Sequence, residues 1–275
     1  MTQTYLVPTA TIVSMVASLA AGLIIPAALY LIVRKIWGGK KLPFFIGCGT
    51  MLVFAFVLEQ LFHTLVLSLP IGVTLQSNIW LYALYGGFAA GLFEETGRFV
   101  AFSTILKRHR DDDANALMYG AGHGGFEAFY ILVVGMVSNL VLSIMLNRGM
   151  VGVLTMGVPA EMLPTVEATF AQLANTPSWM FLVGIFERIS AVCGHLAMSV
   201  FVWFAVKNKK WYLYPFSILC HALLNIIAVV VNSVAPVWVT EALIFLCAMI
   251  LVLIAARVWR NNAGSLHEGA VSEAD

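Results

Sequence analysis

Seven stretches of this 275-residue chain are long and apolar enough to cross a membrane. A membrane-spanning helix needs roughly 20 mostly apolar residues. Only 11% of the residues are charged, whereas soluble proteins carry about 25%. We therefore predict an all-α, multi-pass protein of the cell membrane with about seven transmembrane helices. The apolar runs cover residues 9–34, 43–68, 78–106, 114–146, 179–206, 212–234 and 238–258.

The distribution of Lys and Arg predicts the orientation. Twelve of the fifteen follow the first, third, fifth and seventh runs, and only Arg148 falls on the opposite side. Because cytoplasmic loops are enriched in Lys and Arg, we expect the N-terminus outside and the C-terminus in the cytoplasm. The twelve are Arg34, Lys35, Lys40, Lys41, Lys107, Arg108, Arg110, Lys207, Lys209, Lys210, Arg257 and Arg260.

Composition also limits the domains and the partners. We expect residues 1–260 to form a single transmembrane domain and residues 261–275 to be a polar cytoplasmic tail. Residues 147–178 are predicted to be an external, amphipathic segment, with apolar side chains at helical spacing beside two glutamates. A formal charge of +1 argues against a nucleic-acid partner, and the lipid bilayer is the expected environment. The apolar positions are Met162, Val166, Phe170 and Leu173, and the glutamates are Glu161 and Glu167.

Polar and charged side chains inside the predicted spans are the main functional signal. A central charge costs ~2.5–3.5 kcal/mol on insertion-based scales, so these groups are expected to face one another or water. The polar and charged positions inside the spans are Glu59, His63, Glu94, Glu95, Arg98, His123, Glu127, Glu187, Arg188, His195, His221 and Asn225.

Four of these residues lie at one predicted depth. At 1.5 Å rise per residue, Glu94, His123, His195 and His221 are roughly 13–18 Å from the cytoplasmic ends of four different helices. Three of them have a partner four residues later on the same helix face: Arg98 after Glu94, Glu127 after His123, and Asn225 after His221. The pairs Glu59/His63 and Glu187/Arg188 are interpreted as structural or cavity-lining.

This set of side chains favours hydrolysis. Glu94 and Glu95 point about 100° apart on a helix, so one can face a cavity while the other is held elsewhere, and Arg98 can neutralise either. A buried carboxylate can act as a general base, and histidines can hold a water or bind a metal. An Asn amide can stabilise an oxyanion.

Three short motifs resemble those of the glutamic-type intramembrane proteases related to the CAAX prenyl endopeptidases and the bacteriocin-processing enzymes. That superfamily carries EExxxR, FxxxH and HxxxN on successive core helices. Here the matching segments are EETGR (94–98), YGAGH (119–123) and HALLN (221–225). The first is one residue shorter, and Tyr119 stands where Phe is usual. These departures, with the HGGFE segment and His195, look more like the YhfC family of intramembrane proteases, a branch of the same superfamily.

The resemblance implies roles for several residues. Glu94 would activate the attacking water, His123 would help to position it, and His221 and Asn225 would line the oxyanion side. Arg98 lies near the motif arginine but not at its spacing. Glu95, Glu127 and His195 join the candidate catalytic set from their predicted depth and helical spacing. The glycines of AGHGGFE are expected to permit close helix approach or a local break beside the site, rather than to bind phosphate.

Alternatives remain from the residues alone. Three histidines and a carboxylate also suit Zn²⁺, with His123, His195 and His221 as ligands, so the expected cofactor is either none or zinc. Buried Glu, His and Arg also build proton-coupled transporters, although the chain has no sign of two similar halves. A seven-span receptor is a third class. We predict an intramembrane endopeptidase that hydrolyses a membrane-associated peptide or protein.

Overall fold

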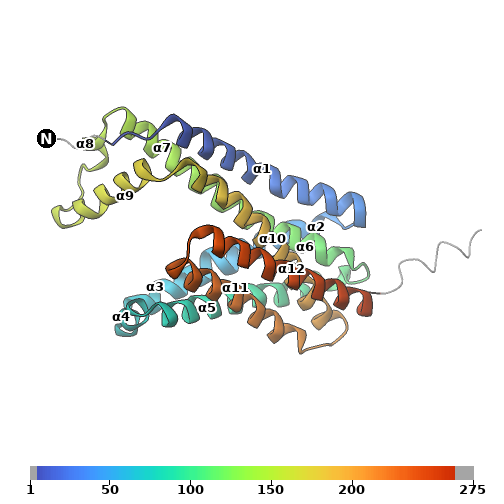
Figure 1. Cartoon of the computed structure of the whole chain (residues 1–275). Coiled ribbons are helices and arrows are strands. Elements are labelled where there is room, and N and C mark those ends of the chain that lie inside the picture. Colours follow the sequence, from blue (N-terminus) through green and yellow to red (C-terminus); the bar gives the residue numbers. More distant parts are fainter. Residues whose placement is uncertain (1–4, 264–275) are drawn as a thin grey trace, which may run out of the picture. The chain divides into compact units, whose positions relative to one another are not determined.

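The computed structural model describes residues 5–263, which fold as helices joined by short turns (Figure 1). Most of the predicted tail, residues 264–275, lies outside the described residues. The helices are α1 (Thr9–Trp37), α2 (Lys41–Thr50), η1 (Met51–Glu59), α3 (Gln60–Ser68), α4 (Pro70–Ser77), α5 (Ile79–Ser103), η2 (Lys107–His109), α6 (Ala114–Phe129), η3 (Tyr130–Val134), α7 (Gly135–Asn147), α8 (Val151–Leu154), η4 (Ala160–Met162), α9 (Leu163–Asn175), α10 (Ser178–Lys207), α11 (Leu213–Val234) and α12 (Val237–Asn262).

Six helical stretches of the described chain are long and apolar enough to span a membrane. They confirm an all-helical, multi-pass membrane protein. The helix α5, which carries Glu94, Glu95 and Arg98, is not among the six, although it follows the predicted 78–106 span closely. A total of seven spans and the orientation therefore stay predictions. The six stretches are Thr9–Trp37, Lys41–Ser68, Ala114–Asn147, Ser178–Lys207, Leu213–Val234 and Val237–Asn262.

Two of these spans are not regular α-helix throughout. Residues Met51–Glu59 and Tyr130–Val134 are π-helical and join α2 to α3 and α6 to α7. Short π-helical turns inside α-helices occur frequently at functional sites. The first π-helix ends at Glu59, and the second begins three residues after Glu127, so both interruptions fall beside polar residues of the predicted spans.

The chain divides into two compact units. One comprises residues 26–127 and 189–263 of the described chain and contains every candidate catalytic residue. Within it, α5 and α11 run side by side (Figure 1). A Cβ atom on Gly87 or Gly91 would lie only 2.7 Å from a carbonyl oxygen of α11. Small residues let membrane helices approach closely, and this contact brings His221 of α11 next to the glutamates of α5.

Glycines also bring α2 against α6. A Cβ on Gly47 would lie 2.2 Å from the Tyr119 carbonyl oxygen, and one on Gly122 would lie 1.9 Å from that of Phe44. The expectation that the glycines around His123 permit close helix approach is therefore confirmed. The backbone of α6 at His123 is fixed by this contact.

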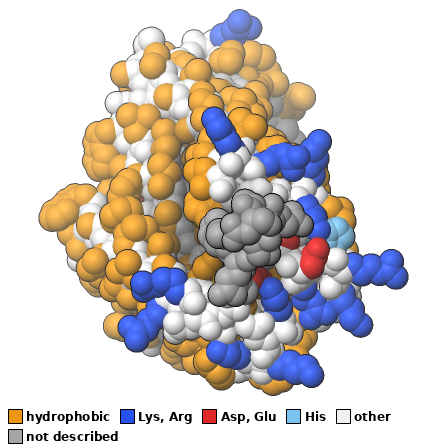
Figure 2. Space-filling view, turned by 90° about the vertical axis from the view of Figure 1, so that its right-hand side faces the viewer, with side chains coloured by type: hydrophobic (Ala, Val, Ile, Leu, Met, Phe, Trp, Pro, Cys, Tyr) orange, Lys and Arg blue, Asp and Glu red, His pale blue; other side chains and the backbone are white. Residues whose placement is uncertain are grey.

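Basic side chains gather at one end of this unit, as Figure 2 shows from that side. Polar contacts tie the loops of this end together: Lys40 Nζ lies 3.2 Å from Asp111 Oδ2, and Lys207 Nζ lies 2.5 Å from Asp113 Oδ1. The hydrogen bond from Lys40 lowers the pKa of Asp111. The structure thus places loops that carry the predicted cytoplasmic cations together, while their side of the membrane stays a prediction.

The other unit comprises residues 5–25 and 128–188 of the described chain. The amphipathic segment predicted over residues 147–178 contains α8, η4 and α9, and two apolar residues of α9, Phe170 and Leu173, are buried in a cluster with Tyr5 and Met15. Asn147 holds the N-terminal segment through bonds of 2.8 and 3.0 Å to the Val7 backbone. Helix α9 therefore packs within this unit through its apolar face.

Candidate active site

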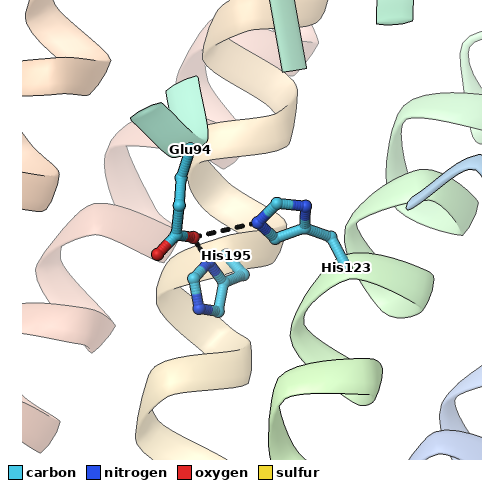
Figure 3. Close-up of side chains that lie close together, drawn as sticks. All are labelled: Glu94, His123 and His195. Carbon is cyan, nitrogen blue, oxygen red and sulfur yellow. Dashed lines mark hydrogen bonds and ion pairs between the residues drawn. The ribbon is translucent and has the colours of Figure 1, made fainter. Parts of the chain in front are cut away.

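Three buried side chains from three helices converge in the interior of the larger unit (Figure 3). Glu94 comes from α5, His123 from α6 and His195 from α10. Each offers one ligand-type atom, and these atoms lie within 4.8 Å of one another. The Oε2 atom of Glu94 is 2.9 Å from Nε2 of His123 and 3.8 Å from Nδ1 of His195.

A third histidine approaches the same carboxylate from α11. His221 Nε2 lies 3.6 Å from Oε1 of Glu94. On the far side of this ring, Nδ1 is 2.8 Å from Oε1 of Glu95. Three imidazole nitrogens therefore surround the carboxylate of Glu94, as the common depth of these residues predicted.

Glu95 is held by a buried network. Its side chain and that of Arg98 are 0% exposed. Arg98 Nη1 donates to Oε1 of Glu95, and the Ser217 hydroxyl donates to Oε2 at 2.6 Å. Of the two adjacent glutamates, Glu95 is thus the one that Arg98 neutralises, while Glu94 faces the histidines.

The partners of His195 fix its tautomer. Arg98 Nη2 lies 2.6 Å from Nδ1 of His195, and a guanidinium can only donate. Nδ1 is therefore the acceptor, and Nε2 carries the hydrogen that it donates to Glu127 Oε2 at 2.8 Å. A carboxylate on the far nitrogen is the usual partner of a metal-binding histidine, and both His195 and His221 have one.

Tyr119, which stands at the Phe position of the FxxxH motif that the segment resembles, packs beside His123. The two rings are stacked with centroids 5.7 Å apart. The buried Tyr119 hydroxyl lies 2.5 Å from Oγ1 of Thr50. The additional hydroxyl of Tyr119 thus has a partner on the neighbouring helix.

Seven of the eight predicted catalytic residues form one connected cluster. The exception is Asn225: no hydrogen bond or ion pair joins its side chain to the other seven within the described part of the chain, and it lines a separate cavity with His63. Glu59 and His63 pair at 3.2 Å, and Glu187 pairs with Arg188 at 2.5 Å. The cluster members are Glu94, Glu95, Arg98, His123, Glu127, His195 and His221.

Sequence reasoning missed two serines of this cluster. Ser217 donates to Glu95, and Ser199 accepts a hydrogen bond from Arg98 Nε at 3.3 Å. Each lies four residues from a site histidine, His221 and His195 respectively. A small polar residue one helical turn from a buried histidine is the signal that could have identified them.

Comparison with known proteins identifies the family of the chain, and the match includes every residue of the cluster. A family model described as YhfC intramembrane metalloprotease matches residues 21–246. The chain belongs to this family. It is also 34% identical over 258 residues to the uncharacterized membrane protein YhfC of Bacillus subtilis (strain 168), which covers 90% of this chain and 98% of that protein. No solved structure matches the chain.

The YhfC family description implies a metal, and the residues of the cluster fit one. Two imidazoles and a carboxylate are zinc-type ligands, and Glu94, His123 and His195 bring such atoms within 4.8 Å. His123 Nδ1 is buried and hydrogen-bonded to no described residue. Arg98 and a metal ion would use the same lone pair of His195, so metal binding requires this guanidinium to move from Nδ1. This group differs from the predicted ligand set in having Glu94 in place of His221.

Proposed function

We propose that the chain is an intramembrane metalloprotease that hydrolyses a peptide bond of a membrane-associated substrate. The observation that carries the proposal is the convergence of Glu94, His123 and His195 in the buried interior of the larger unit. The family description supports it. The transporter and receptor alternatives have no comparable support.

We assign Glu94, His123 and His195 as the residues that would hold a zinc-type ion. When bound, such an ion polarises a carbonyl and lowers the pKa of a coordinated water. Glu127 holds the His195 ring through Nε2, and so keeps the tautomer whose Nδ1 faces Glu94. The buried position of all three ligands excludes bulk water from them.

His221 is assigned as the proton acceptor. Glu95 accepts from its Nδ1, which leaves Nε2 as the basic nitrogen on the side of Glu94. This carboxylate–imidazole pair orients the ring in the way that a carboxylate orients the catalytic histidine of a hydrolase triad. Nε2 would take a proton from the attacking water and return it to the leaving amine.

A metal-free, glutamate-dependent protease is the second candidate. The observation that favours it is the 2.9 Å contact between His123 Nε2 and Glu94 Oε2. As a neutral ring donating from Nε2, His123 would orient Glu94 so that Oε1, on the His221 side, receives the proton from water. In this version, cleavage is indifferent to chelators.

Metal analysis of purified variants tests the proposal. We expect zinc bound to the wild type after dialysis, and its loss in Glu94→Gln, His123→Ala and His195→Ala. His63→Ala is the matched control, because His63 pairs with Glu59 and Tyr85 outside the cluster. Cleavage is followed with a pool of quenched fluorescent peptides, each an apolar 20-residue segment with a varied centre. Cleavage that persists after zinc is fully removed would contradict the metalloprotease and support the second candidate.

A further inference from the structure

A second polar site lies in the same unit as the cluster. It is a cavity of about 370 Å³ between α3, the first half of α5 and α11. Ligand sites commonly have volumes of about 300–1,000 Å³, so this cavity is large enough for part of a peptide. Its polar lining comes from Gln60, His63, Tyr82, Tyr85 and Asn225.

The cavity is continuous in sequence with the proposed catalytic cluster on two of its helices, α5 and α11. Asn225 follows His221 by one turn, and Gly87 precedes Glu94 by two turns, about 10 Å along the helix axis. His63 follows Glu59 by one turn and pairs with it at 3.2 Å. A ligand in the cavity would therefore lie one to two turns from the cluster.

Part of the lining is already ordered, and part is available to a ligand. His63 is held by Tyr85 at 2.7 Å and by Glu59 at 3.2 Å. Among the described residues, the Asn225 amide has no hydrogen-bond partner, and Gln60 makes only a long bond of 3.4 Å to the Ala55 carbonyl. An amide offers both donors and an acceptor, as does the backbone of a peptide.

The chemistry of a membrane substrate explains why such groups lie here. A helical peptide must unwind locally before its backbone can be attacked, and each unsatisfied backbone group costs several kcal/mol in lipid. Amide and phenol groups beside the cluster would replace the lost backbone hydrogen bonds. The lining includes no Lys or Arg, which disfavours a lipid phosphate as the occupant.

We propose that this cavity is the substrate subsite of the protease, where the unwound segment next to the scissile bond pairs with the Asn225 amide through its main chain. This inference rests on the proposed function. Asn225 then binds substrate beside the reacting bond, in place of the oxyanion role that its motif implied.

Gly86 provides a direct test, because it lines the cavity and a Cβ atom there would meet nothing within 4 Å. Gly86→Leu places a side chain in the cavity without a backbone clash. Gly49→Leu is the matched control: Gly49 is also helical and equally open, but it is exposed on α2. Binding is measured by the anisotropy of a fluorescein-labelled copy of the peptide pool with Glu94→Gln protein, which does not require cleavage.

We expect Gly86→Leu to weaken peptide binding at least tenfold, about 1.4 kcal/mol, and to raise KM with little change in kcat. Metal content and thermal stability should match those of Gly49→Leu. Asn225→Ala should also weaken peptide binding, and Asn225→Gln should recover part of the lost affinity. If Gly86→Leu does not fold, the peptide binding of Gly86→Ala and Asn225→Ala is compared instead, and unchanged binding in both variants overturns the subsite.

Unchanged peptide binding in folded Gly86→Leu overturns the subsite, whether or not the protein is a protease. Cleavage retained by Glu94→Gln overturns the proposed function instead, while the binding comparison still decides on the cavity. If Gly86→Leu alters binding of phosphatidylglycerol vesicles but not of the peptide pool, the cavity holds lipid and the subsite is wrong.

Discussion

His221 and Glu95 are joined by a 2.8 Å hydrogen bond between Nδ1 and Oε1. An ionised carboxylate can only accept, so Nδ1 carries the hydrogen and Nε2 is the basic atom. That atom faces Glu94 at 3.6 Å. The ring is thus oriented by one glutamate and presented to the other.

This relationship separates the role of His221 from that of the ligands. We expect His221→Gln to lower kcat by about 10²–10⁴-fold, the usual contribution of a general base, while zinc content stays near that of the wild type. Zinc is measured by elemental analysis, and His109→Gln, at η2 and outside both the cluster and the cavity, controls for the substitution itself. Loss of zinc in step with activity would instead make His221 a ligand, as the residue pattern first suggested.

The buried pair of Glu95 and Arg98 predicts an asymmetric stability effect. Glu95→Gln leaves the guanidinium buried without its counter-charge, which costs about 3–5 kcal/mol in proteins where such pairs have been broken. The double variant Glu95→Gln/Arg98→Met removes both charges and should recover much of that loss. Unfolding is followed in mixed micelles that contain dodecyl sulfate. Asp111→Asn, at the exposed Lys40–Asp111 pair, is the control, and its unfolding free energy should match that of the wild type. A double variant less stable than Glu95→Gln would show that Arg98 contributes mainly through His195 and Ser199.

The contact between α2 and α6 predicts a glycine requirement. Gly122→Ala would place a Cβ 1.9 Å from the Phe44 carbonyl oxygen, and overpacking of this kind costs about 1–3 kcal/mol. Because His123 is the next residue, zinc affinity should fall as well. Gly49→Ala, whose Cβ meets nothing within 4 Å, should change neither stability nor affinity. Equal behaviour of the two variants would mean that the helices can separate at no cost.

Tyr119→Phe tests the departure from the superfamily motif. The substitution removes the hydroxyl that lies 2.5 Å from Thr50 Oγ1, whereas the ring can still pack on His123. Thr50 keeps its own contacts with backbone carbonyls at 2.9 and 3.0 Å. We expect a loss of about 0.5–1.5 kcal/mol in unfolding free energy and unchanged peptide cleavage. A large fall in kcat would assign the hydroxyl to the reaction itself.

The sequence predicted the helices and the cluster because both follow from local rules. Apolar length indicated the spans, and a count of helical rise placed Glu94, His123, His195 and His221 at one level. The same rules could not separate Glu94 from Glu95, since the choice depends on which helix packs on which face. In the structure Arg98 bonds Oε1 and Ser217 bonds Oε2 of Glu95, and Glu94 is the glutamate that faces the histidines.

Two features depended on tertiary packing and could not be predicted. Asn225 shares a helix face with His221, yet it lines a separate cavity with His63. The π-helical residues 51–59 and 130–134 could not be recognised from composition, because both segments are apolar and so look like any other part of a membrane span. Spacing of four residues thus predicted a neighbour along the helix but not what that neighbour would contact.

The charges of α5 also bear on how the chain is made. The two α11 groups that bond Glu95, from Ser217 and His221, are 122 and 126 residues later in the chain. The ribosome therefore synthesises α5 well before Ser217 and His221 exist. The helix α5 is also not among the six apolar spans. The remaining partners of Arg98 come from α10 and those of Glu95 from α11, both of which are synthesised after α5. The buried network around Glu95 and Arg98 is thus complete only once these two later helices have joined the bundle.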